Sequence, residues 1–234
     1  MRLLTLIATR PRDYRRKNAL ALATALLLAF TLSATAALAD DGIRSASSDR
    51  TKVQDVSLEL VGQVTNSPAG VSPATSNQYG YVADLHGQAI FNSDTQNETS
   101  ALFTFYTQTT TTRVIANGPL RIVSRDGTLT LYRDPSANGN FASPDSFRDG
   151  TPVLVASLRQ QVIVNTITGS FTTMNSNTIT STSPFPAGDA QLQLGRLGQQ
   201  FKTILNGQQN SPTPSAHMAG YTLDTSGDRA GGDE

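Results

Sequence analysis

The sequence has no cysteine and no tryptophan, and its 234 residues include only two histidines. Without cysteine there are no disulfides, no thiol chemistry and no cysteine-bound zinc. Two histidines do not supply a multi-histidine metal site. His86 ends an expected strand beside Gly87, and His217 falls in a polar C-terminal stretch. We therefore expect neither to serve as the base of a Ser-His-Asp site.

Charge is also sparse. Only 15% of the residues are charged and 38% are hydrophobic, whereas Ser, Thr, Asn and Gln are abundant. This composition is typical of an all-β extracellular domain rather than of a helical or disordered chain. The length allows one domain of ordinary size with terminal extensions.

The first 39 residues have the pattern of an export signal. A basic segment, MRLLTLIATRPRDYRRKN, is followed by an apolar run that ends in Ala37-Leu38-Ala39. A basic region, an apolar region and a small-residue cleavage site define a signal peptide. We predict cleavage before Asp40 and a secreted or periplasmic protein. An uncleaved membrane anchor is the alternative, because residues 19–39 are long enough to span a bilayer; Arg15-Arg16 leaves twin-arginine export open.

Removal of this segment changes the charge balance. It takes away six of 18 basic residues and one of 18 acidic residues, which leaves 12 against 17 and a formal charge of −5. No basic stripe remains that would meet a phosphate backbone, so nucleic acid is excluded as a partner. Membrane contact is expected only through the signal segment.

The rest of the chain divides into three parts. Residues 40–53 are polar and predicted to form a flexible leader. Residues 54–205 are predicted to form the folded domain, which is long enough to bury a sizeable core. Residues 206–234 are rich in Gly, Pro, Ser and Asp, and this composition predicts a disordered tail.

Strand signals fill the domain. Apolar and polar residues alternate with a period of two in several segments, as in half-buried strands; the clearest are 56–64, 79–85 and 153–167. The pattern predicts about eight strands joined mainly by hairpins. We expect an antiparallel meander that closes into a β-barrel and so leaves no exposed edge. A sandwich of two sheets is the alternative.

Two dipeptides carry the signal of a two-residue hairpin loop, Asn117-Gly118 and Asp126-Gly127. The second predicts a tight turn with positive φ at Gly127. In that register Ile122 lies opposite Leu131, and the apolar residues of both arms share one face.

The stretch GTLTLYRDPSANGNFASPDSFRDGTPV, at 127–153, resembles a block found in secreted bacterial β-rich proteins without an assigned function. Together with the strands around it, over roughly 79–205, the meander is similar in outline to the barrels of the allene oxide cyclase and dirigent class. The matching residues are turn residues. The resemblance therefore implies a barrel and export, and it implies no catalytic residue.

One loop of this stretch has the spacing of a calcium site. Calcium loops place oxygen ligands at positions 1, 3 and 5, a glycine at 6, a backbone carbonyl at 7 and a carboxylate at 12. Counted from Asp134, these positions hold Asp134, Ser136, Asn138, Gly139, Asn140 and Asp145. Weak Ca²⁺ binding is one prediction. The other is a purely structural loop, because Asp and Asn cap their own backbone in Asx-turns.

The chain has no recognisable catalytic motif. A carboxylate pair across the lumen, Glu59 and Asp84, would suit a glycosidase, but Glu59 alternates with core residues and is expected to face water. Gly195 and Gly198 lack the βαβ context of a phosphate cradle.

We therefore expect a structural role or the binding of a small apolar ligand, with a lumen lined by Tyr79, Tyr81, Phe103 and Phe105. A cyclase or isomerase that uses the lumen and a cell-envelope interaction module are the alternatives. No cofactor is predicted apart from the calcium ion.

Overall fold

The computed structural model describes residues 51–210 and 215–225. The predicted signal peptide, residues 1–39, lies outside the described residues. No helix in the described ranges is long and apolar enough to cross a membrane.

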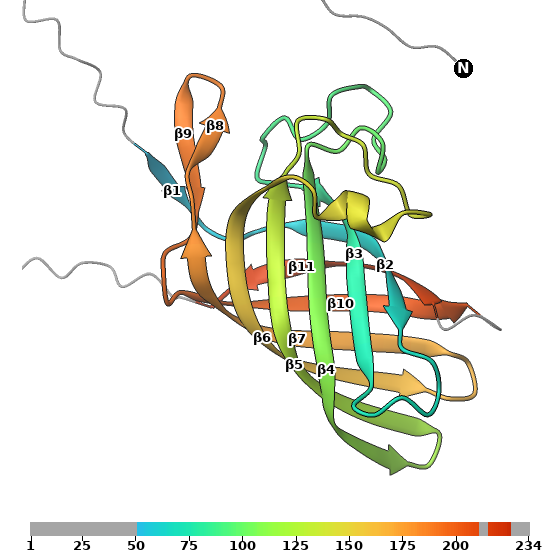
Figure 1. The fold of residues 1–234 in the computed structure, drawn as a ribbon. Helices are drawn as coiled ribbons and strands as arrows, with labels where there is room; N and C mark the ends of the chain where they lie inside the picture. Colours follow the sequence, from blue (N-terminus) through green and yellow to red (C-terminus); the bar gives the residue numbers. More distant parts are fainter. Residues whose placement is uncertain (1–50, 211–214, 226–234) are drawn as a thin grey trace, which may run out of the picture. The chain divides into compact units, whose positions relative to one another are not determined.

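Antiparallel strands form a closed barrel of eight strands (Figure 1). Each pairs with its neighbour in sequence, β7 pairs directly with β10, and β11 pairs with β2 to close the cylinder. The predicted all-β barrel is confirmed, and the two-sheet sandwich is excluded. The barrel strands are β2 (Glu59–Asn66), β3 (Thr75–Asp84), β4 (Phe103–Asn117), β5 (Leu120–Arg133), β6 (Thr151–Asn165), β7 (Ser170–Thr182), β10 (Gln200–Asn210) and β11 (Ser215–Asp224).

The period of two in the sequence sorts side chains between lumen and exterior. In β6, Leu158 and Val162 are buried, whereas Arg159 and Gln161 are exposed. The same alternation brings apolar side chains from every barrel strand into one core. The largest fully buried side chains of this core include Phe105, Phe201, Leu131, Leu154, Ile179 and Leu205.

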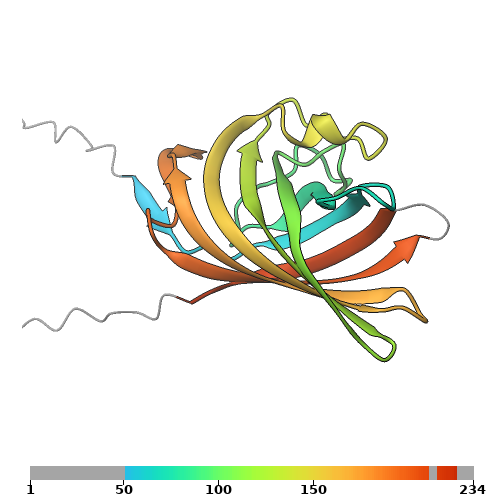
Figure 2. The same cartoon turned by 60° about the horizontal axis from the view of Figure 1, so that its bottom comes forward.

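One end of the barrel is filled and covered. A small sheet of β1 (Lys52–Gln54), β9 (Ala190–Leu194) and β8 (Phe185–Ala187) lies at this end (Figure 1). Its Phe185 ring centroid is 5.1 Å from that of Phe103, and Leu85 and Ile90 of the β3–β4 connection are buried in the same core. We call this the closed end. The end with the β2–β3, β4–β5 and β6–β7 connections is the open end (Figure 2).

The predicted turn at Asp126-Gly127 is wrong. Strand β5 continues through both residues, and Gly127 pairs with Thr109 on one side and Leu158 on the other. A Cβ on Gly127 would lie 2.0 Å from the carbonyl oxygen of Gln108, so this glycine allows close approach of two strands rather than a reversal. The hairpin signal at Asn117-Gly118 is confirmed: Asn117 pairs with Leu120, and Gly118 has φ 55°.

The predicted boundaries of the domain are also corrected. Residues 206–210 belong to β10, and Ser215–Asp224 forms β11, so this part of the predicted disordered tail 206–234 is barrel strand. Its inward positions are small or flexible side chains such as Ala216, Met218 and Thr222, which are all buried. At the other boundary, Lys52 and Val53 of the predicted leader 40–53 pair with β9.

Candidate functional site

The four aromatic residues predicted to line the lumen are divided between two faces. Phe103 and Phe105 lie in the barrel core. Tyr79 pairs with Tyr106 on the outer face and belongs to a separate cluster. Tyr81 has the same outward orientation as Tyr79, two residues along β3. The prediction that these four aromatic residues line one lumen surface is therefore wrong.

Tyr79 serves to anchor the long loop between β5 and β6. Its ring lies 5.6 Å from Phe147 and 6.3 Å from Phe141, centroid to centroid. Phe147 ends the short helix η1 (Pro144–Phe147) and is fully buried. The guanidinium of Arg148 lies 4.8 Å above the Tyr106 ring. This outer cluster fixes the loop over β3 and β4, and it has the composition of a structural contact.

Two of the loop residues proposed as calcium ligands, Asp134 and Asn140, accept hydrogen bonds from backbone amides of the loop itself, whereas the Asn138 side chain donates to the carboxylate of Asp149 at 3.1 Å. Asp134 is buried; its carboxylate accepts hydrogen bonds from the amides of Ser136 at 2.9 Å and Asn138 at 3.4 Å. Asn140 accepts from the amide of Ala142 at 2.8 Å. These are the Asx-turns of the structural interpretation.

The last proposed calcium ligand points elsewhere. Asp145 is exposed and forms an ion pair of 2.8 Å with Arg148. Within residues 51–210 and 215–225, no three His, Asp or Glu side chains form a group able to hold a metal ion. Weak calcium binding by the oxygens of this loop stays a prediction, and the turn geometry accounts for Asp134 and Asn140 without it.

The other carboxylate candidates do not face each other across the lumen. Glu59 and Asp84 are adjacent partners on β2 and β3, and both are exposed. Asp84 accepts a hydrogen bond from the amide of His86 at 3.2 Å. His86 is exposed, so this corner is a solvated strand end.

The lumen instead contains a polar layer that the sequence interpretation missed. Arg125, Gln160, Asn175 and Thr203 are successive cross-strand partners on β5, β6, β7 and β10. Gln160, Asn175 and Thr203 are buried at 3%, 4% and 1% exposure. All four side chains face inward. The polar layer therefore lines the inside of these four strands, between the apolar closed end and the open end.

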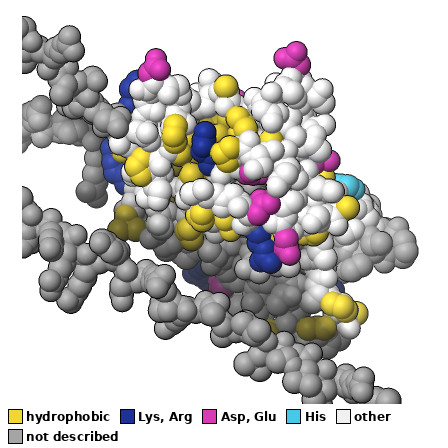
Figure 3. Space-filling model, turned by 45° about the horizontal axis from the view of Figure 1, so that its top comes forward, with side chains coloured by type: hydrophobic (Ala, Val, Ile, Leu, Met, Phe, Trp, Pro, Cys, Tyr) yellow, Lys and Arg dark blue, Asp and Glu magenta, His cyan; other side chains and the backbone are white. Residues whose placement is uncertain are grey.

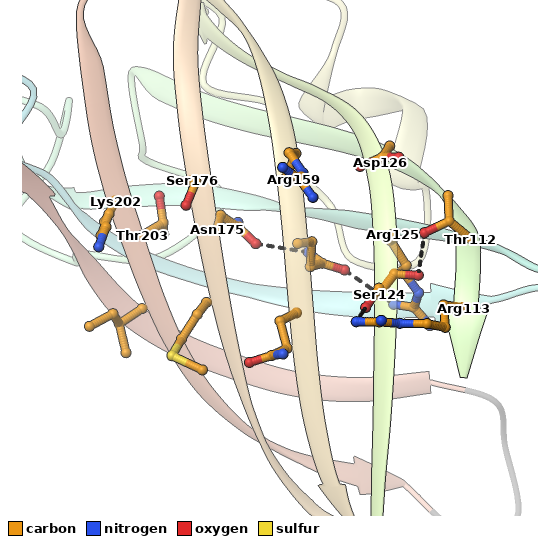
Figure 4. A pocket seen from close by; sticks show the side chains of 14 residues that line it. Thr112, Arg113, Ser124, Arg125, Asp126, Arg159, Asn175, Ser176, Lys202 and Thr203 are labelled. Carbon is orange, nitrogen blue, oxygen red and sulfur yellow. Dashed lines mark hydrogen bonds between the residues drawn. The ribbon is translucent and has the colours of Figure 1, made fainter. Parts of the chain in front are cut away.

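Arg125, on β5, is the first residue of this polar layer. Its Nη1 donates to Oε1 of Gln160 at 3.3 Å, and the Nε2 of Gln160 donates to Oδ1 of Asn175 at 3.1 Å (Figure 4). Its Nη2 donates to Oδ1 of Asn66 at 3.1 Å, and its Nε donates to Oγ1 of Thr111 at 3.4 Å. Three strands besides β5 thus hold the guanidinium in one orientation.

The charge of Arg125 has no described counter-ion. All of its hydrogen-bond acceptors are neutral, and no carboxylate of the described chain forms an ion pair with it. Burial, with a smaller contribution from the positive charge of Arg121, lowers the pKa of Arg125 to about 10. The group is still a cation at neutral pH, and its environment disfavours that charge.

A cavity of about 870 Å³ lies at the open end of the barrel, and Arg125 is one of its lining residues. We call it the open-end cavity. Beneath it a space of only about 40 Å³ continues inward, also bounded by Arg125. Both cations, Arg121 and Arg125, line the larger cavity, whereas no Asp, Glu, His or Tyr of the described residues does so. Its apolar lining residues include Val71, Val114, Val123, Val164 and Ile167.

A second hollow of about 720 Å³ runs along the outer face of β5, β6, β7 and β10 (Figure 4). Its lining includes the outward residues Arg159, Lys202 and Met174. Four residues of the polar layer also border it, namely Arg125, Gln160, Asn175 and Thr203. The closed end, turned forward in Figure 3, presents basic, acidic and apolar side chains interspersed with one another. The second hollow has Asp126 among its lining residues and therefore carries charges of both signs, whereas the described lining of the open-end cavity carries positive charges alone.

A signal for the polar layer is present in the sequence. Gln160 interrupts the inward apolar series of β6, between Leu158 and Val162. A polar residue at an inward position is informative, because a buried amide needs a partner. With a turn at Asp126-Gly127, Arg125 would lie on the face opposite to Leu129 and Leu131. Because β5 runs straight through both residues, Arg125 lies on the same inward face as these leucines.

Comparisons with protein-family models, with curated proteins and with solved structures each found no match. The role of the open-end cavity has to be inferred from the residues that line it.

Proposed function

We propose that the protein is an exported binding protein, and that it holds a small, partly apolar molecule in the open-end cavity. The observation that carries this proposal is the contrast within the barrel. The closed half is packed, whereas the open end has a concave space of about 870 Å³. Ligand pockets in proteins typically have volumes of about 300 to 1,000 Å³.

The lining suits a ligand with both apolar and polar parts. Valine and isoleucine side chains form its apolar walls, and amide and hydroxyl groups of Asn66, Thr111 and Gln209 are interspersed among them. A largely apolar pocket with a few placed polar groups is the usual composition of a small-molecule site. The ligand proposed here is therefore more polar than the purely apolar one that the sequence suggests.

The alternatives receive less support. An enzyme that relies on acid–base chemistry needs a titratable group within reach of its substrate, and the described lining of the cavity offers only two arginines. An interaction module would suit a barrel filled throughout, whereas this barrel has a concave space of about 870 Å³ at its open end. A cyclase that acts by shape alone would need the same cavity, so binding is the property to test first.

Export is the other half of the proposal. It is supported by the basic and apolar segments that precede Ala37-Leu38-Ala39. N-terminal sequencing of protein recovered from culture medium or periplasm should give Asp40 as the first residue. Recovery only from membranes with Met1 intact would contradict it.

The binding test is fluorescence titration of the exported protein with Nile red, a neutral apolar dye, accompanied by native mass spectrometry for a co-purifying molecule. Ala69→Trp adds bulk at the rim of the cavity, where Ala69 is exposed. The matched control is Ala142→Trp, at an exposed alanine of the β5–β6 loop. We expect saturable binding that Ala69→Trp weakens and Ala142→Trp leaves unchanged. Equal binding by both variants would place the dye elsewhere and contradict the proposal.

A further inference from the structure

We infer that the ligand of the open-end cavity carries an acidic group, and that Arg125 binds this group. The inference rests on the proposed binding function and specifies its ligand as a small amphipathic anion, of which a carboxylate with an apolar chain is the simplest case.

The positive charge of Arg125 is not balanced by a described carboxylate. A buried cation is stable when it is paired or fully hydrogen-bonded. Arg125 has neutral acceptors only, and Arg121 adds a second positive charge to the same cavity. The described lining supplies no negative charge. A bound anion would supply it and offset the cost of removing the guanidinium from water.

Arg125 has more hydrogen-bond donors than described acceptors. A guanidinium has five N–H groups. Three hydrogen bonds join Arg125 to described residues, one each from Nε, Nη1 and Nη2. One N–H on each terminal nitrogen therefore has no described protein acceptor. Two parallel N–H groups are the donor set with which arginine binds a carboxylate in bidentate fashion.

Neighbouring side chains fix the orientation of the Arg125 guanidinium. The amide nitrogen of Gln160 donates to Asn175, and this bond orients the amide so that its oxygen accepts from Arg125. Asn66 holds Nη2 from the opposite strand β2. These contacts fix the plane of the guanidinium before any ligand arrives, and such preorganisation lowers the entropic cost of binding. Gln160 and Asn66 are positioning residues in this scheme.

Apolar side chains line the same cavity as the Arg125 guanidinium. Val123 and Val164 line the same cavity as Arg125, and Val114 and Ile167 line it nearer the rim. An acid group on Arg125 would therefore leave its apolar chain against these side chains. The space of about 40 Å³ beneath is too small for the chain, so the chain must lie toward the open end.

The test compares two probes of equal chain length, decanoate and decanol, by isothermal titration of the exported protein at neutral pH. We expect decanoate to bind at least about tenfold more tightly, since charge-assisted bonds to arginine are about twice as strong as neutral ones. Arg125→Gln should remove this preference. Arg125→Lys should retain part of it, because lysine keeps the charge and loses the planar fork.

The control variant is Arg159→Gln, which removes an arginine from the outer face of β6, beside Gln160 in sequence. It should keep the full preference for decanoate. Decyltrimethylammonium tested on the unmodified protein should bind more weakly than decanol, because the cavity is cationic. This last comparison keeps the test valid even if Arg125→Gln fails to fold.

The outcomes separate the two proposals. Equal affinity for decanoate and decanol would overturn the anion inference and leave the binding function standing. Absence of binding by every probe, Nile red included, would overturn the binding function itself. A preference for decanoate that survives in Arg125→Gln would overturn the role of Arg125.

Discussion

The two ends of the barrel are built from the same strands and differ in what fills them. At the closed end, inward positions are large and apolar, and the small sheet and the β3–β4 connection complete the core. Toward the open end, the same inward alternation presents Arg125, Gln160 and Asn175. The first arrangement stabilises the fold, because burial of apolar surface is its main driving force. The second adds a desolvation cost, which is one of the observations behind the proposed binding function.

Removal of a large side chain from the closed half tests most directly whether the two ends differ in their contribution to stability. Phe105→Ala should lower the free energy of unfolding by about 3 to 5 kcal/mol, because Phe105 is 1% exposed and its removal leaves a cavity. Val114→Ala at the open end, where Val114 is 45% exposed, should cost less than about 0.5 kcal/mol. Urea unfolding of both variants measures the difference. Similar losses would mean that the two ends contribute equally to stability.

Substitutions at Gly127 test how closely β4 and β5 pack between the two halves of the barrel. Gly127→Val should destabilise the fold by about 1 to 3 kcal/mol, because its side chain would overlap the backbone of β4 at Gln108 and Thr109. The cause is close strand packing, so Gly127→Ala should already be destabilising. A thermal melt of the two variants checks this. If Gly127→Ala were as stable as the unmodified protein, the contact between β4 and β5 at this point would be looser than the structure has it.

Asp134 tests whether the loop at the closed end is structural. Asp134→Ala should cost about 1 to 2 kcal/mol, because two backbone amides lose their buried acceptor. The loss should be the same in EDTA, in calcium and in magnesium. A melting temperature that calcium raises in the unmodified protein and not in Asp134→Ala would instead support the weak calcium site, for which millimolar calcium is worth about 1 kcal/mol.

Arg125 should give the smallest effect at neutral pH. Arg125→Gln should change the free energy of unfolding by less than about 1 kcal/mol, because lost hydrogen bonds are offset by relief from an unbalanced, partly buried charge. The pH dependence carries more information. The folded pKa of Arg125, about 10, lies below its unfolded value, so the penalty is full below pH 10 and is relieved as the pH rises through 10.

The measurement is the stability of the unmodified protein relative to Arg125→Gln on both sides of pH 10. The difference should move in favour of the unmodified protein as the pH rises, and saturating decanoate should reduce this change by stabilising the cation. Titration of tyrosines is common to both proteins and cancels in the difference. A difference that does not vary with pH would show that the guanidinium is not held at a cost, and would remove the contrast between the two ends.

The sequence was sufficient for the local features of this protein. Alternation with a period of two predicts strands such as β6, because side chains of a strand point to opposite faces whatever the strand packs against. Asn117-Gly118 predicts its hairpin, and Asp134 and Asn140 predict their Asx-turns, because both depend on backbone geometry within a few residues. A chain of such strands, with no disulfide to join them, already favours a closed barrel.

Only the tertiary structure decided which face of each strand became interior. Tyr79 is buried on the outer face because a loop more than fifty residues later folds back over it, and no local pattern specifies that contact. Strand β11 has the polar composition of a tail and becomes ordered because β2 and β10 offer it two edges to pair with. Arg125 faces inward because β5 runs straight through Gly127, and that depends on close packing against β4. Pairing between distant strands selects among the faces that local alternation leaves equivalent, and it thereby places a cation in the lumen.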